Sequence, residues 1–126
     1  MCSSDLLVPA DGGVCTRPNS IGYHGQPYMN TEFGGYMFIP PDRRTFADNS
    51  WGYYKMRLES GDDLCSLIAE QVKTMVEDPR ITGFCYTQFT DIEQEQNGVF
   101  NYDRTPKAPI EKLRAAFSCG KRPQGC

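Results

Sequence analysis

The sequence has no excess of positive charge, no long hydrophobic run and a single histidine. Its 13 Lys and Arg residues are outnumbered by 16 Asp and Glu, which gives a net charge of −3. No basic stripe interleaved with aromatic residues occurs, so a nucleic-acid partner is not expected. The run Leu6-Leu7-Val8 follows an acidic residue and supports neither a signal peptide nor a membrane-spanning helix. We therefore expect a soluble protein with no nucleic-acid or membrane partner.

Metal-binding and redox motifs are also missing. The six cysteines form no C-x-x-C pair, and His24 alone cannot complete a zinc site, so neither a metal nor another cofactor is expected. Cys65 and Cys85 fall inside a predicted helix and a predicted strand, where cysteine packs as a small apolar side chain. The others lie in polar, loop-like sequence: Cys2, Cys15, Cys119 and Cys126. We predict reduced thiols and, with them, a cytoplasmic protein.

What the sequence does contain is the pattern of an α/β fold. Residues 1–26 are rich in Gly, Pro, Ser and Asp, and we predict irregular chain there. Residues 28–33 are typical of a strand, on which Tyr28, Asn30 and Glu32 share one face. Glu32 stands at the end of this run, and two glycines directly after Phe33 break the strand. A carboxylate in that place is where barrel enzymes carry their chemistry.

A helix and a second strand follow a long loop. Apolar residues recur at helical spacing between 64 and 76, and Asp62 and Asp63 are candidates for its N-terminal cap. A second strand is predicted within residues 83–89, and a second helix begins at Pro109. The order strand, helix, strand predicts a βαβ unit with parallel strands and a right-handed crossover.

Two blocks of sequence carry a resemblance to a known family. Residues 25–35, which read GQPYMNTEFGG, resemble the seventh barrel strand of family 2 glycoside hydrolases, the β-galactosidase and β-glucuronidase group. Residues 83–107 resemble the eighth strand and its following loop in the β-galactosidase-like members. The resemblance implies a partial TIM barrel, an incomplete (β/α)8 fold of type β7-α7-β8-α8. In this interpretation residues 27–120 are the C-terminal quarter of the barrel, and residues 121–126 form a tail.

The same resemblance implies a retaining β-glycosidase of carbohydrate metabolism, with Glu32 as its catalytic nucleophile and a β-linked galactoside or similar sugar as substrate. Such enzymes pair the nucleophile with an acid/base carboxylate. The family's acid/base glutamate follows an asparagine, and no Asn-Glu pair occurs in this sequence. A complete barrel also needs about 200 residues or more. The alternative is therefore a non-catalytic sugar-binding or assembly fragment, which pairs with a complementary barrel fragment or with itself through its open strand edges.

Three further residues are candidates for binding the sugar. Trp51, the only tryptophan, could offer its ring as an apolar wall, or it could anchor the loop by packing. Tyr86 falls where family members carry an aromatic residue at the sugar site, and Gln88 could bond a hydroxyl; barrel filling is the alternative for both. Three acids follow in what we interpret as a solvated loop: Asp91, Glu93 and Glu95.

The barrel interpretation also predicts how the strand faces are used. One set of side chains should pack on the helices: Met29, Thr31, Phe33, Cys85, Thr87 and Phe89. The other set should face the barrel interior: Tyr28, Asn30, Glu32, Tyr86 and Gln88.

Overall fold

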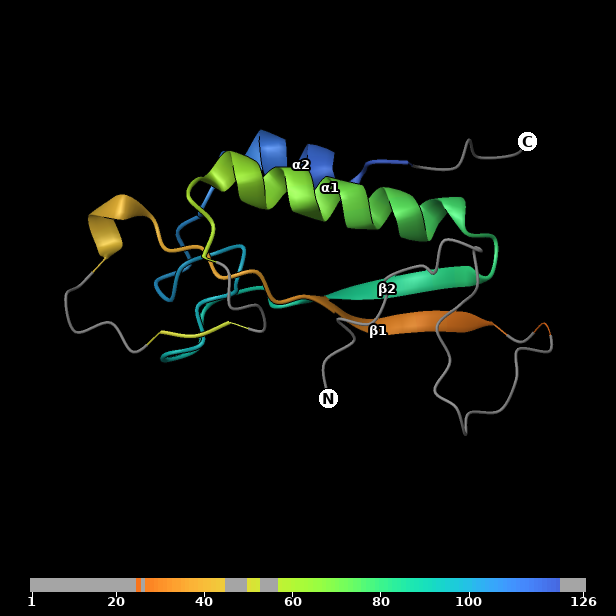
Figure 1. The fold of residues 1–126 in the computed structure, drawn as a ribbon, viewed down its shortest axis with the longest axis horizontal. Helices are drawn as coiled ribbons and strands as arrows, with labels where there is room; N and C mark the ends of the chain where they lie inside the picture. The colour runs from red at the N-terminus through yellow and green to blue at the C-terminus, as the bar shows by residue number, and fades with distance from the viewer. Residues whose placement is uncertain (1–24, 26, 45–49, 53–56, 121–126) are drawn as a thin grey trace.

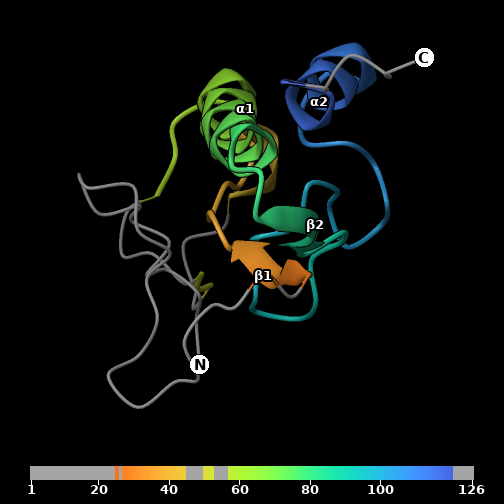
Figure 2. The same ribbon diagram turned by 90° about the vertical axis from the view of Figure 1, so that its right-hand side faces the viewer.

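The computed structural model describes residues 25, 27–44, 50–52 and 57–120 of the chain. Their regular elements are strand β1 (Tyr28–Gly34), the 3-10 turn η1 (Pro41–Arg43), helix α1 (Gly61–Glu77), strand β2 (Ile81–Thr87) and helix α2 (Ile110–Phe117). β1 and β2 pair in parallel, which confirms the predicted βαβ unit. Both helices lie on one side of this two-stranded sheet (Figures 1 and 2). The described part is thus a small two-layer α/β arrangement.

The N-cap of helix α1 lies two residues before Asp62, the first of its two predicted caps. Ser60 is the N-cap: its hydroxyl accepts a hydrogen bond from the Asp63 amide at 3.1 Å, and Asp63 Oδ2 accepts one from the Ser60 amide at 3.0 Å. Asp63 therefore takes part as the third helical residue of a capping box, not as the cap itself. Asp62 instead pairs with Lys112 of α2, with 2.6 Å between Oδ1 and Nζ.

The core lies between the helices and the sheet. Helix α1 contributes Leu64, Ile68 and Val72, which recur every four residues on one face of the helix and are completely buried. α2 adds Leu113 and Ala116. Neither helix in the described part has the length and apolarity needed to cross a membrane.

An irregularity in β1 changes which side chains face this core. The pairing runs from Asn30 opposite Phe84 to Phe33 opposite Tyr86, so β1 advances three residues where β2 advances two. One extra residue on a strand is a β-bulge, and it reverses the alternation beyond it. Asn30 and Phe33 are consequently both buried, and Asn30 Nδ2 donates to Met75 Sδ of α1 at 3.4 Å.

The predicted faces are therefore largely wrong. Of the set expected on the helices, Phe33 is buried, but Met29 is 52% exposed, Phe89 is 66% exposed and Cys85 is exposed as well. Of the set expected to face a barrel interior, Asn30 and Tyr86 pack toward the helices instead. A pattern of period two does not decide which face is buried. On β2 the alternation holds, but Phe84 and Tyr86 take the helix side and Cys85 the other. On β1 Asn30 takes the helix side, and the bulge brings Phe33 to that side as well.

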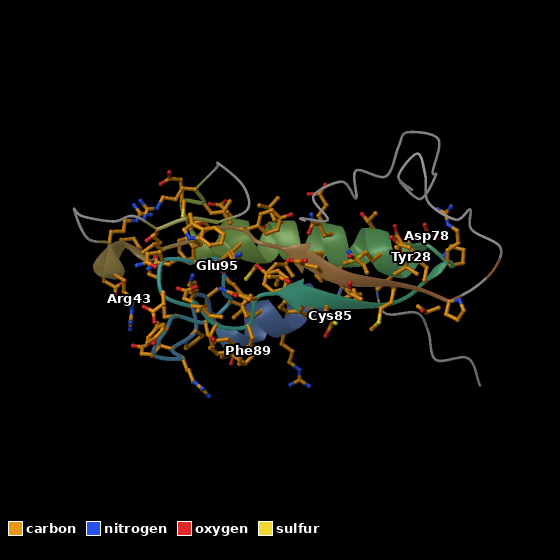
Figure 3. The ribbon with its side chains drawn as sticks, turned by 90° about the horizontal axis from the view of Figure 1, so that it is seen from below. Tyr28, Arg43, Asp78, Cys85, Phe89 and Glu95 are labelled. Atoms are coloured by element: carbon orange, nitrogen blue, oxygen red, sulfur yellow. The ribbon has the colours of Figure 1, made fainter. Side chains whose placement is uncertain are left out.

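The chain segments that follow the two strands are joined to each other. Arg43 of η1 reaches the loop after β2, where its Nη1 lies 2.7 Å from Asp103 Oδ2 and its Nη2 donates to Thr105 Oγ1 at 3.1 Å. Hydrogen bonds from Thr105, together with Arg43, lower the pKa of Asp103 to about 2. Figure 3 shows Arg43, Phe89 and Glu95 at this end of the molecule, opposite to Tyr28 and Asp78.

Candidate functional site

The candidate site lies where β1 and β2 end side by side. Because the strands are parallel, both C-terminal ends fall at the same edge of the sheet, and the Gly35 amide donates to the Thr87 carbonyl at 2.7 Å. Glu32 comes before this junction on one strand, and Gln88 follows it on the other. Carboxyl ends of parallel strands are where α/β folds carry their ligands.

Glu32 occupies the irregular stretch of β1. Its side chain is half-buried, and its amide donates to Asn30 Oδ1 at 3.3 Å. Within the described part of the chain its carboxylate forms no hydrogen bond and no ion pair. Phe33, the next residue, packs into the core, and bulges are a common means of re-aiming a neighbouring side chain. Glu32 is thus a carboxylate whose oxygens are not committed to the described structure.

The two glycines after Phe33 have a structural cause. Gly34 and Gly35 have φ values of +97° and +79°, a region that residues other than glycine rarely adopt. A Cβ on Gly34 would also lie 2.7 Å from Cδ2 of Tyr86, closer than real contacts allow. The ring of Tyr86 stacks edge-on against Phe33 and against Phe117 of α2. Tyr86 therefore supports the end of β1 from the helix side.

Trp51 lies close to both strand ends. Its amide donates to the Gln94 carbonyl at 2.8 Å, and its carbonyl accepts from the Gln96 amide at 3.0 Å. On its other side, Gly52 packs so closely on the chain after β1 that an added Cβ would lie 2.8 Å from Met37 Cβ and 3.1 Å from the Gly35 carbonyl oxygen. The residue is nevertheless 47% exposed. This places the backbone of Trp51 between the chain after β1 and the loop after β2.

Gln88 and Glu95 join Trp51 in this arrangement. Gln88 Nε2 donates to the Glu95 carbonyl at 3.2 Å, and Glu95 Oε1 accepts from Asn97 Nδ2 at 3.2 Å. The structure therefore brings Trp51 and Gln88 together through residues 94–96, whereas the ring of Tyr86 packs on the other side of β2, against Phe117 of α2. Glu95 was expected in a solvated loop, but it is half-buried in this group. Its position depends on contacts with residue 51, which no local sequence pattern reveals.

A buried ion pair lies beneath the same loop. Lys107 Nζ is 2.7 Å from Asp91 Oδ1 and donates to the Gln96 carbonyl at 3.0 Å, and the two side chains are 0% and 6% exposed. Asp91 Oδ1 also accepts from the Gly98 amide at 2.9 Å. Burial raises the pKa of Asp91 and lowers the pKa of Lys107, and their mutual hydrogen bond opposes both shifts. The expectation of a solvated Asp91 is wrong.

In the described ranges no group of three or more His, Cys, Asp and Glu is arranged to hold a metal ion. Cys65 is a buried free thiol, Cys85 an exposed one and Cys119 a half-buried one. The remaining cysteines and His24 lie outside the described residues.

No protein-family model matches the chain, and no curated protein matches it in sequence. The interpretation of the site therefore depends on its own chemistry.

Proposed function

We propose that the chain is the nucleophile-bearing segment of a retaining β-glycosidase that acts on a β-linked galactoside or similar sugar. In this proposal β1 and β2 are the seventh and eighth strands of a (β/α)8 barrel whose other strands come from elsewhere. The observation that carries it is Glu32: a half-buried carboxylate toward the C-terminal end of a parallel strand, uncommitted to the described residues, on a strand whose following chain packs against Gly52, the neighbour of the half-exposed Trp51. The family resemblance of residues 25–35 and 83–107 points the same way.

The chemistry assigned to Glu32 is displacement at the anomeric carbon. One carboxylate oxygen forms a bond to that carbon while the glycosidic bond breaks, and an acid supplied by the rest of the barrel protonates the leaving oxygen. Water then releases the sugar and regenerates the carboxylate. Trp51 would offer its ring to the apolar face of the sugar, and Gln88 and Glu95 would contact hydroxyl groups. Tyr86 would not contact the sugar; it would support the end of β1 from the helix side of the sheet.

A second candidate is sugar binding or assembly without turnover. The side of the sheet away from the helices exposes Met29 and Cys85, which fits a surface that meets further strands of a complementary fragment or of a second copy. In that case Trp51, Gln88 and Glu95 would retain affinity for a sugar, and Glu32 would form no covalent bond.

Covalent labelling distinguishes these functions. A 2-deoxy-2-fluoro-β-galactosyl fluoride needs no acid to expel fluoride, so it tests the nucleophile even when the acid/base residue is absent. We would incubate it with the full chain, alone and together with a fragment that supplies six barrel strands, and locate the adduct by peptide mass spectrometry. The expected result is an adduct on Glu32.

Two variants make this test specific. Glu32→Gln should abolish the adduct, because an amide is a poor nucleophile, whereas Glu70→Gln on the exposed side of α1 should leave labelling unchanged. An adduct on another residue, or one that persists in Glu32→Gln, would show that Glu32 is not the nucleophile. Saturable binding of methyl β-galactoside without any adduct would favour the non-catalytic function.

A further inference from the structure

We infer that the buried pair Asp91–Lys107 is a positioning device that fixes Trp51 for sugar stacking. Its link to a sugar rests on the proposed function; its link to Trp51 does not. The path from the pair to the backbone of Trp51 is short: Lys107 Nζ donates to the Gln96 carbonyl at 3.0 Å, and the Gln96 amide donates to the Trp51 carbonyl at 3.0 Å. A single residue therefore separates the ammonium group from the backbone of Trp51.

The pair grips the loop at two points. Lys107 holds the Gln96 carbonyl, and Asp91 Oδ1 accepts from the Gly98 amide at 2.9 Å. Gly98 lies so close to the chain that a Cβ added there would be 2.5 Å from the Asp91 amide nitrogen. Residues 96–98 are thus fixed by hydrogen bonds at both ends and pack closely on Asp91. Because the backbone of Trp51 forms hydrogen bonds with residues 94 and 96 of this loop, the position of Trp51 depends on the Asp91–Lys107 pair.

Stability alone does not account for the pair. Taking two charges out of water costs free energy, and burial shifts the pKa of both groups toward their neutral forms. An apolar pair of similar volume often stabilises a fold as well or better. What an apolar pair cannot do is donate to the Gln96 carbonyl while accepting from the Gly98 amide. The function we assign to the pair is this fixed geometry.

A charge-free variant tests the inference. In Asp91→Asn combined with Lys107→Met, no unpaired charge is left, and the asparagine oxygen can still accept from the Gly98 amide. What is lost is the hydrogen bond from position 107 to the Gln96 carbonyl. Trp51 is the only tryptophan, so intrinsic fluorescence reports on its surroundings alone. We expect red-shifted emission, stronger quenching by acrylamide, and affinity for methyl β-galactoside that is about two- to tenfold weaker.

Two controls separate positioning from general loss of stability. Lys112→Met removes an exposed lysine that pairs with Asp62, and should leave the Trp51 signal unchanged. Val72→Ala weakens the core inside α1, and should lower the free energy of unfolding without moving Trp51 in the folded protein. If Val72→Ala altered emission and quenching as much as the charge-free variant does, the inference would be wrong.

The outcomes are distinguishable from failure of the proposed function. Unchanged emission and quenching in the folded charge-free variant would overturn the positioning role, even if the wild-type chain binds the sugar. Altered emission in a chain that never binds methyl β-galactoside would support positioning and count against the sugar site. If circular dichroism shows the variant unfolded, Asp91→Asn with Lys107→Leu, which also lacks a donor for the Gln96 carbonyl, takes its place and is judged by the same criteria.

Discussion

Gly34→Ala should be among the most damaging small substitutions in the chain, although it adds only a methyl group. Two costs act at once. Gly34 has φ +97°, a conformation that costs roughly 1–2 kcal/mol for any residue with a Cβ. The new Cβ would also overlap the ring of Tyr86, and forcing a methyl group into packed structure costs about 1–3 kcal/mol. Together we expect a loss of about 2–5 kcal/mol in the free energy of unfolding.

Gly25→Ala is the matched control, because it isolates the backbone term. Gly25 has φ +89°, and an added Cβ would meet nothing within 4 Å. Its substitution should therefore cost only the conformational part, roughly 1–2 kcal/mol. Removing the ring provides the reverse test: in a Tyr86→Ala background, Gly34→Ala should cost no more than Gly25→Ala does in the wild-type chain.

Urea unfolding followed by far-ultraviolet circular dichroism measures these differences. With a slope of about 1–3 kcal/mol per molar urea, Gly34→Ala should lower the midpoint by about 1 M or more. Equal losses for Gly34→Ala and Gly25→Ala would refute the argument that Tyr86 occupies the space beside Gly34. A loss at Gly34 that is undiminished in the Tyr86→Ala background would refute it as well.

Three other results are expected. Ser60→Ala should cost about 0.5–2 kcal/mol in urea unfolding, because it removes the capping box of α1, and a cost below the error of the fit would contradict that role. Lys107→Met alone should cost about 3–5 kcal/mol at neutral pH. Without Lys107, burial raises the pKa of Asp91 further above its ordinary 3.8. Between pH 3.8 and the raised pKa of the folded state, the folded state then binds more protons than the unfolded state does. The free energy of unfolding should therefore fall as pH rises through that window, and a loss independent of pH would contradict the buried carboxylate. In the native chain iodoacetamide should modify Cys85 well before Cys65, because Cys65 is buried and burial raises the pKa of its thiol; peptide mapping that shows the reverse order would contradict the assigned faces of β2 and α1.

Local patterns in the sequence were sufficient for the elements themselves. The spacing of Leu64, Ile68 and Val72 predicted helix α1 and its buried face, because a helix of 3.6 residues per turn places such residues on one side. The order of elements predicted the parallel pairing of β1 and β2, since a helical crossover brings the second strand back in the same direction. Two adjacent glycines predicted the end of the first strand directly after Phe33; β1 runs one residue further, to Gly34, and both glycines have positive φ values.

The cap of α1 was missed for a reason that is still local. Asp62 and Asp63 have the chemistry of a cap, and so does Ser60. The choice between them depends on which backbone amide each side chain reaches. A capping box made by Ser60 and Asp63 satisfies both ends, which explains why the helix begins at Gly61.

The faces of the strands and the composition of the site were decided by tertiary structure. Whether Glu32 follows the alternation of Asn30 depends on a bulge, and the bulge is defined by pairing with β2, some fifty residues further along the chain. The same is true of Trp51 and Glu95, which are joined by hydrogen bonds across a long loop. The sequence by itself therefore determined helices, strands and their direction, because these depend on neighbours within a few residues. Only the packed structure decided which carboxylates are buried, paired or available, because that depends on contacts between residues far apart in the chain.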